Sequence, residues 1–246
     1  MAKAASRPVF SVYLPVYNEE KVLEKNVMRV DQALHAIGKP YEIIIVDDNS
    51  TDKSSAIAKR LARKKSIRAL RYENGPSRRE NQGRAFAEAK GDIIAFMDID
   101  LATDLKDLSL LLTSVYSKKW DVAIGSRYIH GAVIKRLTVR RIYSWCYNTA
   151  IRMLFDSRID DHQCGFKAYR KSVVMDLLNR MGYDSSFKRG WFWDAEMMIR
   201  AQKQGLHIRE LPVVWTRGAK TSFSFKREIK VIPYMIGFRF RLWGGK

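Results

Sequence analysis

Residues 93–104 read IIAFMDIDLATD, an apolar run followed by Asp98 and Asp100, two positions apart. A short apolar run of this kind is typical of a buried strand. Two carboxylates at i and i+2 point to the same side of an extended chain. Mg²⁺ or Mn²⁺ commonly takes one or two such carboxylates and lets substrate phosphates complete its shell. The stretch therefore predicts a strand that ends at a metal site formed by Asp98 and Asp100. The alternative is a solvated strand end, with Asp104 capping the next helix.

Strands and helices alternate on both sides of this stretch. The expected strands are 9–16, 41–48, 67–72, 92–98, 120–126 and 166–169, and the expected helices are 21–37, 54–63, 81–89, 137–155 and 193–204. This alternation predicts an α/β fold with a mostly parallel sheet flanked by helices. Ligands bind beyond the carboxyl ends of such strands, where Asn18-Glu19 and Asp47-Asp48 are also expected.

The bulk composition limits the classes of protein. A chain of 246 residues with 46% hydrophobic and 29% charged residues can form one folded domain, so disordered and collagen-like classes are excluded. A net charge of +19 calls for an anionic partner: nucleic acid, an acidic membrane or a phosphorylated substrate. Neither cysteine has metal-ligand spacing, so we expect a reducing, cytoplasmic location. We expect no export signal in residues 1–10 and no transmembrane span, because no apolar run approaches about 18 residues.

Four motifs carry a resemblance. LPVYNEE (14–20), EIIIVDDNSTDKS (42–54), NQGRAFAEAKGDIIAFMDID (81–100) and GSRYIHG (125–131) occur in the order and spacing of the inverting family 2 glycosyltransferases. The chain resembles this family closely over about its first 170 residues. The resemblance implies a Rossmann-like GT-A fold, with residues 1–222 as the catalytic domain, and a nucleotide-sugar donor bound with Mg²⁺ or Mn²⁺.

The same resemblance implies a set of donor-binding residues. Asp47 and Asp48 match the acidic pair that meets the base and ribose, and which of them reads the base stays open. Asp100 is the more direct metal ligand of its pair, and Ala102 stands where related enzymes often carry a glutamine ligand. The implied donor-binding residues are Pro15, Tyr17, Glu19, Asp47, Asp48, Asp98, Arg217 and Lys220.

The acceptor is implied by GSRYIHG, RRIYS (140–144) and DDHQCGFKAYRKS (160–172), which resemble the dolichyl-phosphate mannose synthases and their glucosyl counterparts. In that comparison Arg127, Arg140 and Ser144 hold a polyprenyl phosphate, and Arg141 could replace Arg140. A phosphate monoester is already anionic at neutral pH and attacks without a general base. We expect hexose transfer from GDP-mannose, with UDP-glucose as the alternative donor.

Two further readings stay open. In FWDAEMM (192–198), Glu196 matches a positioning residue, whereas a hydroxyl-directed transferase would use Asp194 or Glu196 as its base; either residue could instead face solvent. A nucleic-acid binder is the least favoured reading, because no RNP, KH or zinc-finger motif occurs. The basic cluster at 59–84 is interpreted as a solvated rim, and His162 is the histidine closest to the acceptor motif.

Membrane contact is expected from the C-terminal segment 223–246, which mixes cations with aromatic residues and predicts an amphipathic interfacial segment on an anionic membrane. Its aromatic residues are expected at headgroup depth: Phe225, Tyr234, Phe238, Phe240 and Trp243. Pro233 is expected to kink or split its helix. The helix at 137–155 is a second candidate, with Val139, Ile142, Cys146 and Met153 on one stripe, although such stripes commonly pack on the core. A peripheral membrane enzyme is therefore expected.

Overall fold

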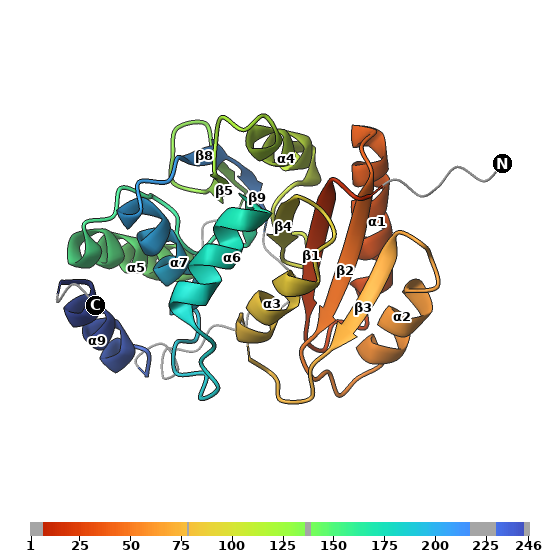
Figure 1. The fold of residues 1–246 in the computed structure, drawn as a ribbon, viewed down its shortest axis with the longest axis horizontal. Coiled ribbons are helices and arrows are strands. Elements are labelled where there is room, and N and C mark those ends of the chain that lie inside the picture. Colours follow the sequence, from red (N-terminus) through yellow and green to blue (C-terminus); the bar gives the residue numbers. More distant parts are fainter. Residues whose placement is uncertain (1–6, 78, 136–138, 217–229, 244–246) are drawn as a thin grey trace.

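The computed structural model describes residues 7–77, 79–135, 139–216 and 230–243 of the chain (Figure 1). The strands are β1 (Phe10–Val16), β2 (Tyr41–Asp47), β3 (Ile67–Arg71), β4 (Ile93–Met97), β5 (Val122–Ser126), β6 (Val133–Ile134), β7 (Phe166–Arg170), β8 (Ile208–Pro212) and β9 (Val214–Trp215). The α-helices are α1 (Leu23–Ile37), α2 (Ser54–Leu61), α3 (Glu80–Ala85), α4 (Leu108–Tyr116), α5 (Val139–Phe155), α6 (Lys171–Met181), α7 (Phe192–Lys203) and α9 (Ile232–Trp243). Two 3-10 helices are η1 (Phe86–Glu88) and η2 (Leu105–Asp107).

The central sheet has seven strands in the order β3-β2-β1-β4-β7-β5-β8. β1 pairs in parallel with β2 and β4, β2 with β3, and β5 with β8, whereas β7 runs antiparallel between β4 and β5. The expected α/β fold with a mostly parallel sheet is confirmed. Because β2, β1 and β4 are parallel neighbours, the polar residues after these three strands lie along the same edge of the sheet.

The sheet is buried on both faces, as its near-continuous apolar strands require. Alternate residues of β1 face opposite sides, so Val12 and Leu14 contact the layer of α1, α2 and α4, while Tyr13 contacts the layer of α3, α6 and α7. Figure 1 shows these two helical layers on either side of the strands. The two cores hold the strand ends, and therefore the polar residues after them, in fixed positions.

Four elements of the second half were not predicted: α6, β8 and the two-residue strands β6 and β9. In α6, Val174, Leu177 and Met181 are buried at helical spacing, a signal that the sequence does contain. β8 reads IRELP, and its alternation is too weak to identify, since four of its five residues are half-buried or exposed.

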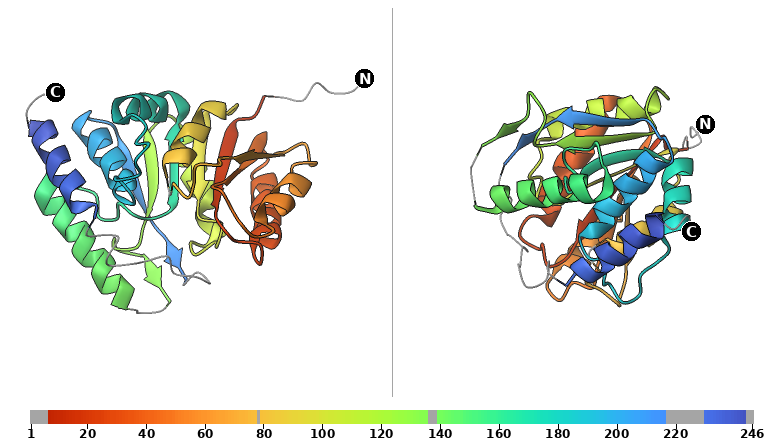
Figure 2. Two further views of the ribbon diagram at one scale, coloured as in Figure 1. Left: turned by 90° about the horizontal axis from the view of Figure 1, so that it is seen from below. Right: turned by 90° about the vertical axis from the view of Figure 1, so that its left-hand side faces the viewer.

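The helix α9 packs on the body of the protein beside α5 and α7. A third apolar cluster joins these helices, with Phe155 and Phe238 ring centroids 5.5 Å apart. In Figures 1 and 2, α5 and α9 lie side by side along one flank. Pro233 lies in the first turn of α9, where its missing N–H has no helical acceptor to lose. Residues 217–229, which bear on the prediction that Pro233 splits a longer helix, lie outside the described residues.

The predicted boundary between residues 222 and 223 falls outside the described residues. None of the helices in the described part of the chain combines the length and the apolar character that a membrane crossing needs.

Candidate active site

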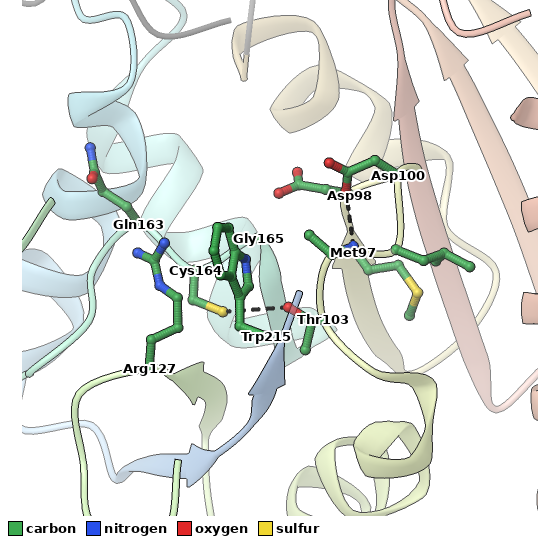
Figure 3. A pocket seen from close by; sticks show the side chains of 11 residues that line it. Met97, Asp98, Asp100, Thr103, Arg127, Gln163, Cys164, Gly165 and Trp215 are labelled. Carbon is green, nitrogen blue, oxygen red and sulfur yellow. Dashed lines mark hydrogen bonds between the residues drawn. The ribbon is translucent and has the colours of Figure 1, made fainter. Parts of the chain in front are cut away.

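A pocket opens beyond the carboxyl ends of β4 and β5. Its walls come from the turn after β4, from Arg127 after β5, from the residues just before β7 and from β9 (Figure 3). The lining residues are Met97, Asp98, Asp100, Leu101, Ala102, Thr103, Arg127, Gln163, Cys164, Gly165 and Trp215. Figure 3 shows the two aspartates on one wall and Arg127 with Gln163 on the other. The pocket thus places carboxylates opposite a guanidinium.

The acidic wall is a tight turn. The Leu101 N–H donates to the Asp98 carbonyl at 3.0 Å, and the Ala102 N–H donates to Asp100 Oδ1 at 3.1 Å. Leu101 takes a positive φ of 50°, a conformation that costs energy in a non-glycine residue. This turn brings both carboxylates to the pocket. Ala102 lines the same wall, and its methyl side chain has no oxygen that could act as a metal ligand.

The carboxylate of Asp98 is held from behind by a buried ion network. Arg79 donates to Asp98 Oδ1 through Nη2 and to Asp194 Oδ2 through Nε, both at 3.0 Å. The Lys167 ammonium, fully buried, donates to Asp194 Oδ1 at 2.9 Å. Gly165 leaves space for the Asp98 carboxylate, because a Cβ at this position would overlap it. Two cations and two carboxylates therefore balance one another at the edge of the pocket.

This network corrects two sequence-based interpretations. Arg71 and Arg79 belong to the basic cluster at 59–84, yet Arg79 is 4% exposed and contacts Asp98, and Arg71 donates to Asp47 Oδ2 at 2.6 Å. The cluster is therefore not merely a solvated rim. The solvent-facing alternative is wrong for Asp194, which is 2% exposed.

The predicted donor residues of the first two strands lie at the ends of β1 and β2 or just after them, and they do not line this pocket. Pro15 lies in β1, and Tyr17 and Glu19 follow it, with Tyr17 43% exposed. Asp47 accepts from the Ser50 N–H at 2.9 Å, in a local turn.

Asp48 is turned toward α3. Its carboxylate accepts from the Ser77 N–H and from Asn81 Nδ2, each at 2.7 Å. Because β1 lies between β2 and β4, these acidic residues share the edge of the sheet with the pocket.

The cationic wall is built around Arg127, at the end of β5. Asp161 accepts from Arg127 Nε at 2.6 Å and from Nη2 at 2.8 Å. Nη2 also donates to the Ser144 hydroxyl at 3.2 Å, so α5 is joined to the same cluster. The Ser144 hydroxyl in turn donates to Gln163 at 3.4 Å. The structure thus brings Arg127 and Ser144 together.

Asp161 is fully buried. Burial by itself would raise the pKa of Asp161, but the adjacent Arg127 guanidinium holds that pKa below its usual range. Its backbone N–H and that of Asp160 donate to the Glu210 carboxylate on β8, at 3.2 and 2.9 Å. The acidic loop under Arg127 is therefore anchored to the sheet.

His162 is structural in this arrangement. It is fully buried, with Nε2 2.8 Å from the Ser157 hydroxyl and Nδ1 3.0 Å from Asn148 Oδ1. Desolvation lowers the pKa of His162 to about 3, so the ring is neutral at physiological pH. Asn148 also donates to the Ser144 carbonyl at 2.9 Å, which ties this histidine to the helix that carries Ser144.

Glu196 lies away from the pocket. It is fully buried, and its carboxylate accepts from Arg200 Nε and from the Tyr234 hydroxyl of α9, each at 2.8 Å. The solvent-facing alternative is therefore wrong for Glu196 as well. Its carboxylate joins α7 to α9, and its positioning role stays a prediction.

Four predicted side chains lie outside the described part of the chain. Arg140 and Arg141 fall within α5, but their side chains lie outside the described residues, as do Arg217 and Lys220.

The part of the chain that forms the sheet and the pocket matches a known protein family. The family model described as glycosyl transferase family 2 matches residues 11–178, which include β1 to β7 and both walls of the pocket. The chain belongs to glycosyl transferase family 2.

The chain is similar in sequence to several curated glycosyltransferases. It is 35% identical over 231 residues to Glycosyltransferase AglD of Haloferax volcanii, covering 93% of this chain and 36% of that protein. It is 26% identical to Dolichyl-phosphate beta-glucosyltransferase of Saccharomyces cerevisiae, with shares of 83% and 66%. It is 32% identical to Dolichol-phosphate mannosyltransferase of Pyrococcus furiosus, with shares of 96% and 64%. The chain thus spans less than two thirds of each of these relatives.

Among solved structures, glucosyl-3-phosphoglycerate synthase of Mycobacterium tuberculosis, in complex with Mn²⁺, UDP and glucosyl-3-phosphoglycerate, superposes with a TM-score of 0.66. The match covers 94% of this chain and 80% of that one at 17% identity. This likeness concerns the fold, and it confirms the GT-A architecture that the motifs imply.

The acidic wall of this family 2 member fits a divalent cation. Asp98 and Asp100 supply hard oxygen donors to one pocket, the side chain of Asp98 is 46% exposed, and Gly165 leaves room for its carboxylate. Among the described residues, no group of three or more His, Cys, Asp or Glu side chains could hold a metal. A cation held by these two carboxylates would complete its shell with water or with oxygens of a bound ligand.

Sequence reasoning missed Arg79, Asp161, Gln163 and Trp215. Asp161 and Gln163 lie within the acceptor motif DDHQCGFKAYRKS, and Arg79 lies within the basic cluster at 59–84. The motif and the cluster were identified, but the roles of these single residues were not. Their partners are distant in sequence: 115 residues separate Arg79 from Asp194. No local pattern identifies such a pair.

Proposed function

We propose that this chain transfers a hexose, mannose in preference to glucose, from a nucleotide sugar to a polyprenyl phosphate with inversion at C1. One observation carries the proposal: a single pocket has an acidic wall, Asp98 and Asp100, facing a cationic wall built on Arg127. Two phosphorylated reactants need these opposite surroundings, one for the donor diphosphate with its cation and one for the attacking anion.

On the donor side, Asp98 and Asp100 would hold Mg²⁺ or Mn²⁺. When bound, the cation would offset the negative charge that develops on the leaving nucleoside diphosphate. The role of the chain is to fix both carboxylates. Arg79 holds Asp98, and the turn at Leu101 orients Asp100.

On the acceptor side, Arg127 and Ser144 would bind the phosphate. Within the described residues, Asp161 and Ser144 engage Nε and Nη2 of Arg127, which leaves the Nη1 hydrogens for an anion. Asp161 fixes the guanidinium plane, and a fixed fork suits the oxygens of a phosphate. Arg140, or Arg141, would add a second cation from α5.

The chemistry requires no proton acceptor for such a substrate. A phosphate monoester oxygen attacks C1, the bond to the nucleoside diphosphate breaks, and its electron pair leaves with that group. A hydroxyl acceptor would need a base, and the two candidates are poorly suited to that task. Asp194 is held by Arg79 and Lys167, and Glu196 by Arg200 and Tyr234. These ion pairs favour the phosphate acceptor.

The names of the relatives bear on acceptor and sugar in different ways. The yeast and Pyrococcus proteins are both named for transfer to a dolichyl phosphate, which supports a lipid phosphate acceptor. One name specifies glucose and the other mannose. The motif DHQCGFK favours the glucosyl branch, so UDP-glucose stays the alternative donor.

The decisive experiment uses polyprenyl phosphate with labelled GDP-mannose or UDP-glucose, with and without Mn²⁺, and scores label in organic-extractable lipid. We expect transfer from one donor, loss with a chelator, and loss in Asp100→Asn and Arg127→Gln. Asp104→Asn is the matched control, because this exposed carboxylate caps η2 and does not line the pocket. Label that appears only in a hydroxyl acceptor, or transfer by Asp100→Asn that resists the chelator, would refute the proposal.

We also propose that α5 and α9 form the surface that meets an anionic membrane. The stripe on α5 faces outward, with Ile142 63% and Met153 80% exposed, so the core-packing alternative is wrong for these two residues. On α9, Ile232, Ile236 and Phe240 are exposed at i, i+4 and i+8. An outward apolar stripe on two adjacent helices of a basic protein fits a lipid interface.

The other face of α9 corrects an expectation. Phe238 is fully buried in the cluster shared with α5 and α7, and Tyr234 donates to Glu196. These two aromatic residues therefore anchor α9 to the protein and do not enter the headgroups. Lys226, Arg227 and Phe225 lie outside the described residues.

Liposome flotation tests this surface. Phe240→Ser with Met153→Ser should lower binding to vesicles of phosphatidylserine and phosphatidylcholine while detergent-solubilised acceptor is still used. Leu110→Ser is the control, because Leu110 is 45% exposed on α4, far from α5 and α9 in Figure 1. Equal flotation of the double variant and the control would exclude this face as the lipid contact.

A further inference from the structure

Trp215 stands in the middle of the pocket. It is the only tryptophan, tyrosine or phenylalanine among the described residues that line it. In Figure 3 its indole stands between Arg127 and Gln163 on one side and the two aspartates on the other. The ring therefore lies between the cationic and acidic walls.

The backbone of Trp215 is fixed on both sides. Val214–Trp215 forms β9, which pairs with β6, and the Lys135 N–H donates to the Trp215 carbonyl at 3.1 Å. Trp215 also forms a bridge with Thr103, and the Thr216 N–H donates to the Ala102 carbonyl at 2.7 Å. The indole is thus attached to the end of the acidic turn itself. A side chain held this way can orient a ligand at little entropic cost.

The chemistry of the indole suits a sugar. Tryptophan presents a broad apolar face and one N–H donor. A pyranose ring has an apolar face of C–H groups and hydroxyls around its rim, so it can pack on the indole and accept from Nε1. The other lining side chains are charged, polar, aliphatic or sulfur-containing and offer no flat surface of this size.

We propose that Trp215 is the platform on which the transferred sugar packs. The inference rests on the proposed function: with the diphosphate at Asp98 and Asp100 and the attacking phosphate at Arg127, the sugar between them lies against the indole. The packing holds C1 in line between the leaving and attacking oxygens. Trp215 is therefore a substrate-contacting residue of the donor sugar.

A rival role is support of Arg127, whose guanidinium carbon lies 5.7 Å from the centre of the Trp215 ring. The two roles differ in which ligand they affect. A sugar platform affects the nucleotide sugar and leaves the free nucleoside diphosphate unaffected. A support for Arg127 affects the lipid phosphate and neither nucleotide ligand.

The test is calorimetric titration of the full chain with the nucleotide sugar that it transfers and, separately, with the matching nucleoside diphosphate. Trp215→Ala should weaken nucleotide-sugar binding by about tenfold or more, the usual loss for a buried tryptophan contact, and diphosphate binding by less than about twofold. Trp215→Phe should keep most of the affinity, which separates lost packing from misfolding. Trp120→Ala is the matched control, because Trp120 also packs under an arginine, Arg209 at 5.9 Å, and does not line the pocket.

The outcomes are separable. Three results would overturn the platform. Trp215→Ala and Trp215→Phe could weaken the binding of nucleotide sugar and diphosphate equally, or Trp215→Ala could leave both affinities unchanged. The third is a raised KM for polyprenyl phosphate with no change in nucleotide binding. If the wild-type chain binds and transfers neither GDP-mannose nor UDP-glucose, the proposed function itself fails. If the wild type transfers a sugar and Trp215→Ala keeps its nucleotide-sugar affinity, only the platform fails.

Discussion

Replacing Asp161 with asparagine should destabilise the protein and disable its acceptor wall together. Asparagine preserves the shape of the side chain but removes the charge that Arg127 faces at 2.6 and 2.8 Å. The Arg127 side chain is only 11% exposed and Asp161 is fully buried, so water cannot replace the lost partner. The variant therefore leaves a buried cation uncompensated.

The magnitude follows from that burial. Removing one partner of a buried ion pair costs about 3–5 kcal/mol. For a domain of this size each kcal/mol lowers Tm by roughly 2–4 °C, so the expected decrease is about 6–20 °C. The sign with pH follows from the lowered pKa of Asp161. The difference between wild type and variant should be complete above the ordinary aspartate pKa of 3.8 and be lost as the pH falls through the lower folded value.

Thermal denaturation at pH 7 and the KM for polyprenyl phosphate are the two measurements. Asp160→Asn is the control, because its pair with Arg152 is exposed, and it should change stability by no more than about 0.5 kcal/mol. The double variant Asp161→Asn/Arg127→Gln removes the unpaired cation and should recover much of the Tm without recovering transfer. The reasoning is refuted if Asp161→Asn has the same Tm as Asp160→Asn, or if the double variant has a lower Tm than Asp161→Asn alone.

Three further predictions concern other buried groups. Because the pKa of His162 is lowered to about 3, the unfolded chain binds a proton below about pH 6.5 that the folded chain excludes, so stability should fall by about 2 kcal/mol from pH 7 to 5. His162→Gln should lack this component in urea denaturation at both pH values. Gly165→Ala places a Cβ on the Asp98 carboxylate and should lower kcat/KM by about 100-fold, with Tm as the folding check. Tyr234→Phe leaves the fully buried Glu196 short of a donor and should cost about 1–3 kcal/mol by urea denaturation; an unchanged midpoint would count against that bond.

The local pattern was enough to predict the α/β alternation. The run at 93–97 is apolar throughout because its strand is buried on both faces, and the aspartates follow where the strand leaves the core. Such features depend on residues close together in the chain. The place of Pro233 in the first turn of α9 is local in the same sense, because that position needs no N–H donor.

The sequence by itself therefore determined the order of the elements, the family motifs and the acidic pair at the end of β4. Only the tertiary structure decided what holds those aspartates. Arg79, from the segment before α3, reaches both Asp98 and Asp194 of α7, and Lys167 joins them from β7. Ion pairs between distant segments depend on how the helices pack on the sheet, and no spacing in the chain encodes that packing. For the same reason the place of Trp215 in the pocket emerged only from the pairing of β9 with β6.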